Sequence, residues 1–287
     1  MMLTLDDLDT MPAPDFAAAL DGVFEDAPWV ARQAAAARPF ATVAALHAAM
    51  LDAVRAAPRE QAAAFLRGHP ELSGAAALAG TMGGASTAEQ RALGLDRPAD
   101  DLATLNAAYH ARFGIPFIVC VRRHTRSSLM EEFRRRLDLD PAAEQATALE
   151  EIGHITRLRL VDRVTGPGVP VVTGSLTTHV LDTAVGRPAV GVGVELFEVG
   201  DDQAVPLATA VTDRQGRTAQ PLLHGAPLRI GQYELRFRVG SLFAGQVPGH
   251  PPFLDVIPIR FGIAEPEAHY HIPLLVSPGA YSTYRGS

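Results

Sequence analysis

The sequence predicts a multidomain protein of mixed α and β type, in which an all-α helical domain is followed by an antiparallel β-sandwich. The 287 residues are enough for two ordinary domains. Apolar residues recur at helical spacing up to about Leu160, and beyond it they alternate with polar or small residues, as in half-buried strands. A run rich in glycine and proline separates the two patterns.

The first predicted domain, residues 1–163, is rich in alanine and arginine. Apolar residues three or four positions apart predict amphipathic helices, for example at Leu102, Leu105, Tyr109 and Phe113. Glycine and proline between such runs predict short turns. We therefore expect several helices with short connections, and no strands, in this domain.

Residues 164–174 are predicted to form a linker, because Thr165-Gly166-Pro167-Gly168 opens it and Pro170 and Gly174 follow. Residues 175–287 are predicted to form the sandwich. Residues 190–199 and 233–239 alternate with the period of strands.

Composition excludes several classes of function. All 25 basic residues are arginine, which excludes Schiff-base and P-loop chemistry that needs lysine. The net charge of -7 argues against a nucleic-acid partner. The single cysteine, Cys120, excludes an intrachain disulfide and a thiolate zinc cluster. The apolar runs are far shorter than a membrane span of about 20 residues, and the start does not read as a signal peptide. We expect a soluble, cytoplasmic protein without a membrane partner.

Histidine and arginine are the chemically useful groups of the second domain. His179 lies on its first predicted strand, Arg217 follows a predicted turn at residues 213–216, and His269 and His271 share one face of a strand. A lone histidine on a strand is more often structural than catalytic. A zinc site made by His179, His269 and His271 is a second interpretation, since three nitrogen ligands and a water suit a catalytic metal.

Three longer motifs change this interpretation. They are Thr178-His179-Val180-Leu181-Asp182, His269-Tyr270-His271-Ile272-Pro273 and the ending Tyr284-Arg285-Gly286-Ser287. Together they resemble 5-hydroxyisourate hydrolase, the transthyretin-like enzyme of urate breakdown. The resemblance implies a transthyretin-like sandwich without a metal or cofactor, which assembles as a tetramer with active sites in the channel between dimers.

The resemblance also implies roles for single residues. The residues that it implies for catalysis are His179, Arg217, His271 and Ser287. Those that it implies for substrate binding are Tyr284, Arg285 and Gly286. His269 is a weaker catalytic candidate than His271. The turn before Arg217 departs from the family pattern, because it reads Thr212-Asp213-Arg214-Gln215-Gly216 where the family favours Thr-Asn-x-Asp-Gly.

In the helical domain each signal has a structural interpretation when taken alone. His69-Pro70 fits the start of a helix, with proline in its first turn. Ser86 and Glu89 have the spacing of a capping box. Arg159 fits a solvated helix face.

In order along the chain, however, these signals belong to a set of motifs that resembles 2-oxo-4-hydroxy-4-carboxy-5-ureidoimidazoline (OHCU) decarboxylase. The set includes Pro28-Trp29, His69-Pro70-Glu71-Leu72, Ser86-Thr87-Ala88-Glu89-Gln90, Phe113-Gly114-Ile115-Pro116-Phe117 and Ile155-Thr156-Arg157-Leu158-Arg159. The resemblance implies an all-α, dimeric enzyme that needs no cofactor. It implies catalysis by His69 and Glu89 and substrate binding by Pro70, Ser86, Gln90, Ile118 and Arg159, with Arg157 as an alternative to Arg159.

The two resemblances concern consecutive reactions. We therefore expect a bifunctional enzyme that hydrolyses 5-hydroxyisourate to OHCU and decarboxylates OHCU to (S)-allantoin, with these small molecules as its substrates. We expect a homotetramer formed through the sandwich, with the helical domains paired. Two alternatives remain open: a transthyretin-like binding module fused to an inactive helical domain, and a zinc-dependent cyclic amidohydrolase.

Overall fold

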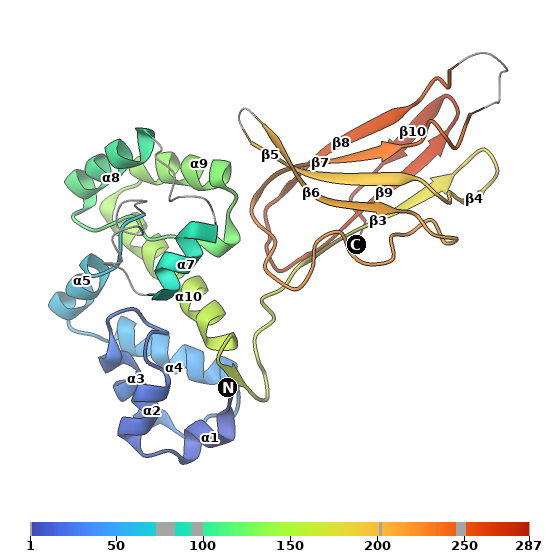
Figure 1. Ribbon diagram of the computed structural model, residues 1–287. Coiled ribbons are helices and arrows are strands. Elements are labelled where there is room, and N and C mark those ends of the chain that lie inside the picture. Colours follow the sequence, from blue (N-terminus) through green and yellow to red (C-terminus); the bar gives the residue numbers. More distant parts are fainter. Residues whose placement is uncertain (1, 73–83, 93–99, 201–202, 245–250, 287) are drawn as a thin grey trace. The chain divides into compact units, whose positions relative to one another are not determined.

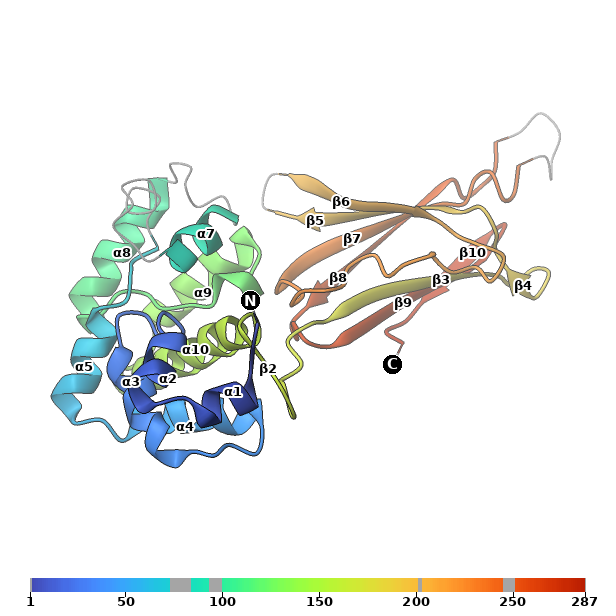
Figure 2. The ribbon, with the colours of Figure 1, turned by 60° about the horizontal axis from the view of Figure 1, so that its bottom comes forward.

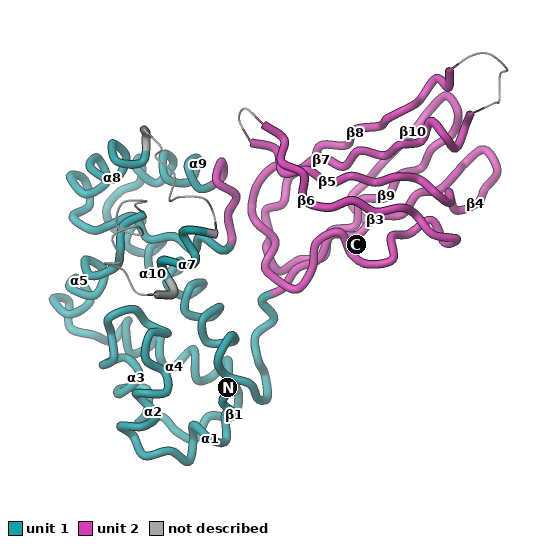
Figure 3. The backbone as a smooth tube through the Cα atoms, viewed as in Figure 1, with its two compact units in different colours: residues 1–122, 129–172 teal, residues 123–128, 173–287 magenta. Residues whose placement is uncertain are grey.

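The computed structural model describes residues 2–72, 84–92, 100–200, 203–244 and 251–286. It divides into two compact units: residues 1–122 with 129–172, and residues 123–128 with 173–287 (Figure 3). Helices dominate the first unit and strands the second (Figure 1). The order of helical and strand regions is as predicted.

The helices make up the first unit, apart from residues 123–128, which are grouped with the second unit. In chain order they are α1 (Leu5–Thr10), α2 (Ala13–Ala19), α3 (Pro28–Ala34), α4 (Val43–Arg55), α5 (Arg59–Arg67), α7 (Gly84–Ala92), α8 (Asp100–Phe113), α9 (Arg126–Leu137) and α10 (Pro141–Val161), with 3-10 turns η1 (Ala35–Ala37) and η2 (Val121–Arg123). None of the helices in the described ranges is long and apolar enough to cross a membrane.

Local sequence explains where the main helices begin. The Thr42 side chain accepts a hydrogen bond from Ala45 N at the start of α4. Asp140 caps α10 by accepting from Ala142 N and Ala143 N, and Pro141 takes the first helical position, where its missing N–H leaves no donor unsatisfied. These caps fix the starts of α4 and α10, two helices that contribute to the core.

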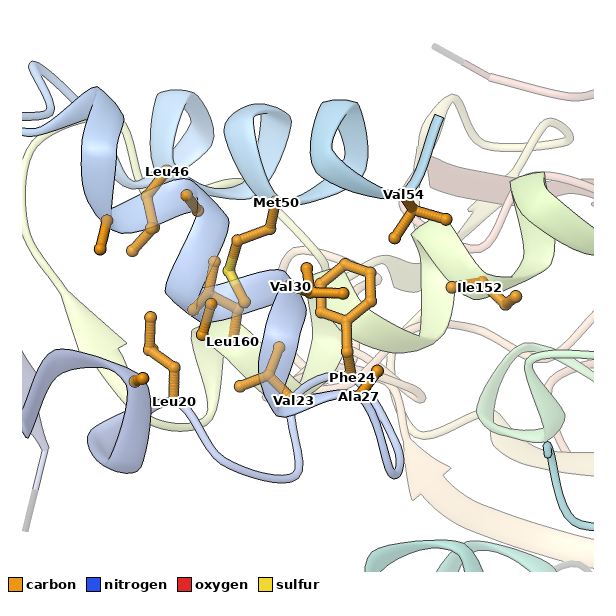
Figure 4. Close-up of a cluster of buried hydrophobic side chains, with 14 of the residues drawn as sticks. Leu20, Val23, Phe24, Ala27, Val30, Leu46, Met50, Val54, Ile152 and Leu160 are labelled. Carbon is orange, nitrogen blue, oxygen red and sulfur yellow. The ribbon is translucent and has the colours of Figure 1, made fainter. Parts of the chain in front are cut away.

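The core of the first unit joins its N-terminal helices to α10. Met50 and Val54 on α4 lie against Val30 and Phe24, and Ile152 and Leu160 of α10 belong to the same cluster of buried side chains (Figure 4). A second cluster surrounds the fully buried Tyr109, Phe117 and Phe133. The burial of these aliphatic and aromatic groups stabilises the helical unit.

The expectation of a strand-free first domain is wrong in one detail. Strand β1 (Leu3–Thr4) pairs in parallel with β2 (Val164–Thr165), and Leu3 N donates to Arg163 O at 2.8 Å. The pair ties the beginning of the unit to the end of α10. Residues 164 and 165, at the start of the predicted linker, thus take part in this pairing.

The second unit is a sandwich of two four-stranded sheets (Figure 2). One sheet has the order β10 (Ala280–Thr283), β9 (His269–Ser277), β3 (Ser175–Asp182) and β4 (Arg187–Pro188). The other has the order β6 (Ala204–Val211), β5 (Gly193–Val199), β7 (Gly231–Arg238) and β8 (Val256–Ile263).

These strands pair in antiparallel fashion, as predicted, except that β3 and β9 run parallel. The exception arises because the chain leaves β3, builds the whole other sheet and then returns to the same side of the sandwich.

Alternation decides which face of β3 and β9 is buried. Leu176, Thr178 and Val180 point into the sandwich, as do Tyr270 and Ile272. The odd-numbered residues of both strands therefore lie on the outer face of the sheet, because neighbouring side chains on a strand point to opposite faces. This parity places His179, His269 and His271 together on one face.

Candidate active sites

The helical unit contains a pocket lined by every residue that the sequence predicted for its site. His69 and Pro70 come from the segment after α5, Ser86, Glu89 and Gln90 from α7, Ile118 from the segment before η2, and Arg159 from α10. Val23, Glu25, Leu72, Phe117 and Thr156 are also part of the wall. The pocket thus combines apolar walls with a few converging polar groups, as ligand sites commonly do.

Arg159 organises the polar side of this pocket. The residue is 6% exposed. Its Nη1 donates to Glu25 Oε2 at 2.9 Å, and its Nη2 donates to Ser86 Oγ at 2.9 Å and to Glu89 Oε2 at 3.1 Å. Among the described residues, Nε of the same guanidinium is buried without a hydrogen-bond partner. One donor therefore remains for a bound anion or carbonyl oxygen.

Glu25 was not predicted from the sequence. Its carboxylate accepts from Ser86 Oγ at 2.5 Å as well as from Arg159, and the side chain is 10% exposed. The available signal was an acidic residue beside the apolar Val23 and Phe24 and just before Pro28-Trp29. That signal is weak, because the residue with which it pairs lies 134 positions away in the chain.

All three structural interpretations of single motifs are wrong. Arg159 is buried and does not lie on a solvated helix face. Helix α7 begins at Gly84, so Ser86 lies inside its first turn rather than at its cap, and its hydroxyl donates to Glu25. His69 and Pro70 follow the end of α5 and are not helical, so they do not start a helix. Tertiary contacts in the pocket replace the local roles that the spacing suggested.

His69 is held as a neutral imidazole with a defined tautomer. Its Nδ1 lies 2.9 Å from Phe65 O, and since a carbonyl can only accept, Nδ1 carries the proton. Burial lowers the pKa of His69, although the Phe65 carbonyl and Glu25 act in the opposite direction. Nε2 is therefore unprotonated near neutral pH and can accept a proton from a substrate.

A buried ion pair supports another part of the pocket wall. Arg136 and Glu144 are 0% and 1% exposed and pair with each other. Arg136 Nη1 also donates to Ile118 O at 2.7 Å, and Cys120 N donates to Glu151 Oε2 at 2.7 Å. These bonds hold the extended segment that supplies Ile118 to the pocket.

The choice between the two arginines of α10 has a geometric answer. Arg159 lines the pocket, whereas Arg157 is not one of the described lining residues. Arg157 instead acts on the buried His47, whose pKa it helps to lower. The structure thus places Arg159, and not Arg157, beside the other residues predicted for this site.

The second site lies on the outer face of β3 and β9. Thr177 is opposite His271 in the parallel register, and His179 is opposite Pro273. The hydroxyl of Thr177 lies 2.7 Å from His269 Nε2 and 2.9 Å from His271 Nδ1. Thr177 was not predicted from the sequence, because a threonine in a strand has many structural roles.

The turn before Arg217 is held by its own side chains. Asp213 Oδ1 accepts from Gln215 N at 2.8 Å and from Arg217 N at 3.1 Å. Gly216 has a φ of +72°, and a Cβ there would lie 2.4 Å from Val180 O and 3.0 Å from His179 Cδ2. Only glycine fits this close approach. The Asp213 turn, in spite of its departure from the family pattern, brings the Arg217 backbone into a bridge with His179.

Gly286 packs against His271. Gly286 N donates to His271 O at 2.8 Å, and a Cβ on Gly286 would lie 2.7 Å from His271 Cδ2. Arg285 lies over the Tyr270 ring at 4.5 Å and 3.9 Å from Glu265, and Tyr284 is exposed. The structure thus brings His179, Arg217, His271 and Gly286 together, while the Arg285 guanidinium is directed to Tyr270. Ser287 lies outside the described residues.

Burial and neighbouring positive charge both lower the pKa of these imidazoles. Burial and then the Arg217 charge lower the pKa of His179, and burial followed by Arg217, His269 and His179 lowers the pKa of His271. Within the described ranges, Nε2 of His179 is buried without a hydrogen-bond partner. A proton acceptor and a cationic donor are therefore close together.

Within the described parts of the chain, no three His, Cys, Asp or Glu side chains are grouped so that they could hold a metal ion. His179, His269 and His271 thus do not form the cluster that the zinc interpretation requires.

Comparison with known proteins agrees with both sequence resemblances. Residues 9–161 match the model of the OHCU decarboxylase family, and residues 176–286 match that of the HIUase/transthyretin family. The 5-hydroxyisourate hydrolase of Deinococcus radiodurans is 51% identical over 113 residues, which cover 39% of this chain and 95% of that protein.

Two other relatives extend into the helical unit. The uric acid degradation bifunctional protein PucL of Bacillus subtilis is 34% identical over 171 residues, which are 58% of this chain and 34% of that protein. The crystal structure of an (S)-allantoin synthase has 34% sequence identity and a TM-score of 0.51, and the match covers 99% of this chain and 100% of that one.

Both resemblances predicted from the sequence are confirmed, and so is the transthyretin-like sandwich. The chain belongs to the OHCU decarboxylase family through its helical unit and to the HIUase/transthyretin family through its sandwich.

Proposed function

We propose that the protein performs two consecutive steps of urate degradation. The sandwich hydrolyses 5-hydroxyisourate to OHCU, and the helical unit decarboxylates OHCU to (S)-allantoin. The observation that carries this proposal is that one chain matches both families and, over nearly its whole length, an (S)-allantoin synthase. Tethering raises the local concentration of the intermediate that the two units share.

The sheet face has the groups that ring hydrolysis requires. A water must lose a proton, a carbonyl oxygen must carry negative charge, and the ring nitrogen must gain a proton as the C–N bond breaks. His179 and His271 are neutral imidazoles that can take up and return the proton. The Arg217 guanidinium can donate charge-assisted hydrogen bonds to the developing oxyanion.

We assign the last residues of the chain to the same site. Gly286 contacts His271 directly, and Tyr284 and Arg285 precede it in the chain, so we assign both to binding of the substrate. In this proposal Arg285 turns from Tyr270 to a carbonyl of the substrate, and the Ser287 hydroxyl completes the catalytic set.

Decarboxylation places different demands on the helical pocket. As carbon dioxide leaves, the electron pair of the broken C–C bond moves into the conjugated ring, and the carbon then receives a proton on one side. Arg159 Nε can bind an anionic oxygen of the substrate, and the neutral His69 and Glu89 can take the hydroxyl proton and supply the carbon proton. Pro70, Gln90 and Ile118 shape the wall that presents one side of the ring.

Assembly is part of the proposal. We infer a homotetramer formed through the sandwich, with paired helical units. Exposed apolar side chains on strands at the edges of both sheets support such contacts: Val205, Leu207, Val211, Val256 and Tyr281. A cytoplasmic location fits the one cysteine of the sequence, Cys120, which is buried.

The purified full chain tests the proposal directly. Added 5-hydroxyisourate is followed by ultraviolet absorbance for ring opening and by circular dichroism for an optically active product. We expect two sequential phases that end in (S)-allantoin. A protein that binds 5-hydroxyisourate without turnover supports the binding-module alternative, and activity that disappears under chelation and returns with zinc supports the amidohydrolase alternative.

A further inference from the structure

Thr177 occupies an unusual place between two histidines. Its hydroxyl oxygen is 2.7 Å from His269 Nε2 and 2.9 Å from His271 Nδ1, and both distances are those of hydrogen bonds. The geometry follows from the parallel register, in which Ser175 is opposite His269 and Thr177 is opposite His271. Thr177 therefore connects the two rings across the strand pair.

The two rings differ in their access to solvent. His269 is exposed at the start of β9, whereas His271 is half-buried beneath Gly286. His271 is surrounded by other groups that carry or can gain positive charge: Arg217, His269 and His179 all act on it. A proton taken up by His271 is therefore readily given up again.

The hydroxyl of Thr177 has one proton to donate and lone pairs to accept with. It can donate to one ring only, so the other ring must donate to it. If His271 Nδ1 carries a proton and donates to Thr177, then Thr177 donates to His269 Nε2. The tautomers of His269 and His271 are thus coupled through the hydroxyl.

We propose that Thr177 relays a proton from His271 to the exposed His269. This inference rests on the proposed hydrolysis. Hydrolysis of a cyclic amide takes a proton from the attacking water and later gives one to the leaving ring nitrogen. When Nε2 of His271 has taken the proton of the water, its Nδ1 proton moves to Thr177 Oγ while the hydroxyl proton of Thr177 moves to His269 Nε2, and His269 releases its Nδ1 proton to solvent. When His271 Nε2 then gives its proton to the leaving nitrogen, the same transfers run in reverse, His269 regains a proton from solvent, and both rings return to their starting tautomers.

In this scheme Thr177 is a positioning and relay residue, because it acts through His271 and need not touch the substrate. The scheme also assigns different roles to the two histidines of the His269-Tyr270-His271 motif. His271 exchanges protons with the reaction, and His269 exchanges them with solvent.

The test compares Thr177→Val, which keeps the shape and removes the hydroxyl, with Thr177→Ser, which keeps the hydroxyl. Hydrolysis of 5-hydroxyisourate is measured in the full chain, in H₂O and D₂O and at several imidazole buffer concentrations. We expect Thr177→Val to lower kcat about tenfold with little change in KM, a smaller loss than the ~100-fold scale of a direct acid or base. Thr177→Ser should retain most of kcat, and imidazole buffer should restore part of it in Thr177→Val.

Thr183→Val is the matched control. Thr183 directly follows β3, and its hydroxyl donates to Val276 O of β9 at 3.1 Å; in the described parts of the chain this hydroxyl has no hydrogen bond to a histidine. Its kcat and solvent isotope effect should equal those of the wild type. Equal kcat in Thr177→Val and the wild type would overturn the relay, and so would a loss that neither serine nor buffer restores.

Nitrogen-15 NMR of the histidine rings separates the relay from the hydrolysis. In the wild type both rings should carry their neutral-state proton on Nδ1, the tautomer pair that the Thr177 hydroxyl imposes, and in Thr177→Val this preference should be lost. The Nδ1–H pair without any hydrolysis would sustain the relay and refute the proposed activity. A wild-type tautomer distribution equal to that of Thr177→Val would refute the relay whatever the activity.

Discussion

The two sites of this chain are built in opposite ways. The polar side of the helical pocket is built around a buried guanidinium, which is bonded to two carboxylates and a hydroxyl from distant parts of the sequence. The sheet site lies on an open face, and its imidazoles are positioned by strand register and by two glycines that touch them. The first depends on side-chain partners and the second on backbone proximity.

This difference determines which substitutions matter in each site. In the pocket, the loss of one charged partner leaves another buried charge incompletely paired, which is unfavourable. On the sheet face, an added methyl group at a glycine displaces a ring that the strands otherwise hold in place. A substitution in one site can therefore be tested by its effect on the activity of that site, while the activity of the other site serves as an internal control.

The largest effect is expected from Glu89→Gln. The change keeps the shape of the side chain and removes the carboxylate that pairs with Arg159 in the pocket. Decarboxylation of OHCU should fall at least ~100-fold, the usual scale of one acid or base group, while hydrolysis stays near the wild-type rate. Glu150→Gln, on an exposed turn of the same α10 helix that carries Arg159, is the control. Equal losses in both activities would show that the two sites are not independent.

The next largest effect concerns the stability of the helical unit. His47 Nε2 lies 2.9 Å from Thr156 Oγ, and burial, together with Arg157 and Arg55, lowers the pKa of His47 from 6.5 to about 4. Because the folded-state pKa is below the unfolded one, protonation favours unfolding. The contribution of His47 is fully present above pH 6.5 and is lost as the pH falls toward 4, up to about 3 kcal/mol.

Urea unfolding followed by helical circular dichroism, at pH 7.5 and at lower pH, checks this dependence. His47→Gln should reduce the pH dependence between about pH 6.5 and 4, since its amide does not titrate in that range. An unchanged dependence in this variant would assign the acid sensitivity to other groups.

An intermediate effect is expected from Gly286→Ala on the sheet face. The new Cβ would lie 2.7 Å from His271 Cδ2, so either the ring or the end of the chain must shift. Displacements of this size can change rates by up to ~100-fold, and we expect hydrolysis to fall at least ~10-fold. Gly279→Ala is the control, because a Cβ at Gly279 would contact nothing within 4 Å. A wild-type rate in Gly286→Ala would show that this contact does not position His271.

The smallest effect is expected from Glu25→Gln. The change removes one of the two carboxylates that hold Arg159, and Ser86 retains an acceptor. We expect kcat/KM for decarboxylation to fall about tenfold, less than the ~100-fold of a group that transfers the proton itself. Because Glu25 raises the pKa of His69, its neutralisation should also shift the acid limb of the pH profile to lower pH.

Asp26→Asn removes the charge of the next residue, which is exposed and also raises the pKa of His69. It should shift the acid limb in the same direction but leave the rate of decarboxylation near neutral pH nearly unchanged. Equal effects of Glu25→Gln and Asp26→Asn on the rate would show that Glu25 acts only through its negative charge and not through its hydrogen bonds to Arg159 and Ser86.

The sequence was most informative where a function rests on local order. Parity along β9 placed His269 and His271 on one face, and the motif of α7 supplied Ser86, Glu89 and Gln90, which the structure brings to one pocket. Glu25 and Thr177 could not be predicted from the sequence, because the residues that they contact are far away in the chain. Glu25 meets Arg159 across 134 positions, and Thr177 meets His271 across 94.

By itself, the sequence determined the order of a helical part and a strand part, the family resemblances and the set of reactive residue types. Spacing and motif order are properties of the chain alone, since they depend on local backbone period and on neighbouring residues. Only the tertiary structure decided that Arg159 rather than Arg157 enters the pocket, that β3 and β9 run parallel, and that Ser86 bonds to Glu25 instead of capping a helix. These three features depend on which side chains are buried and on which hydrogen-bond donors and acceptors from distant parts of the chain meet. Burial and long-range hydrogen bonding are determined only when the whole core packs.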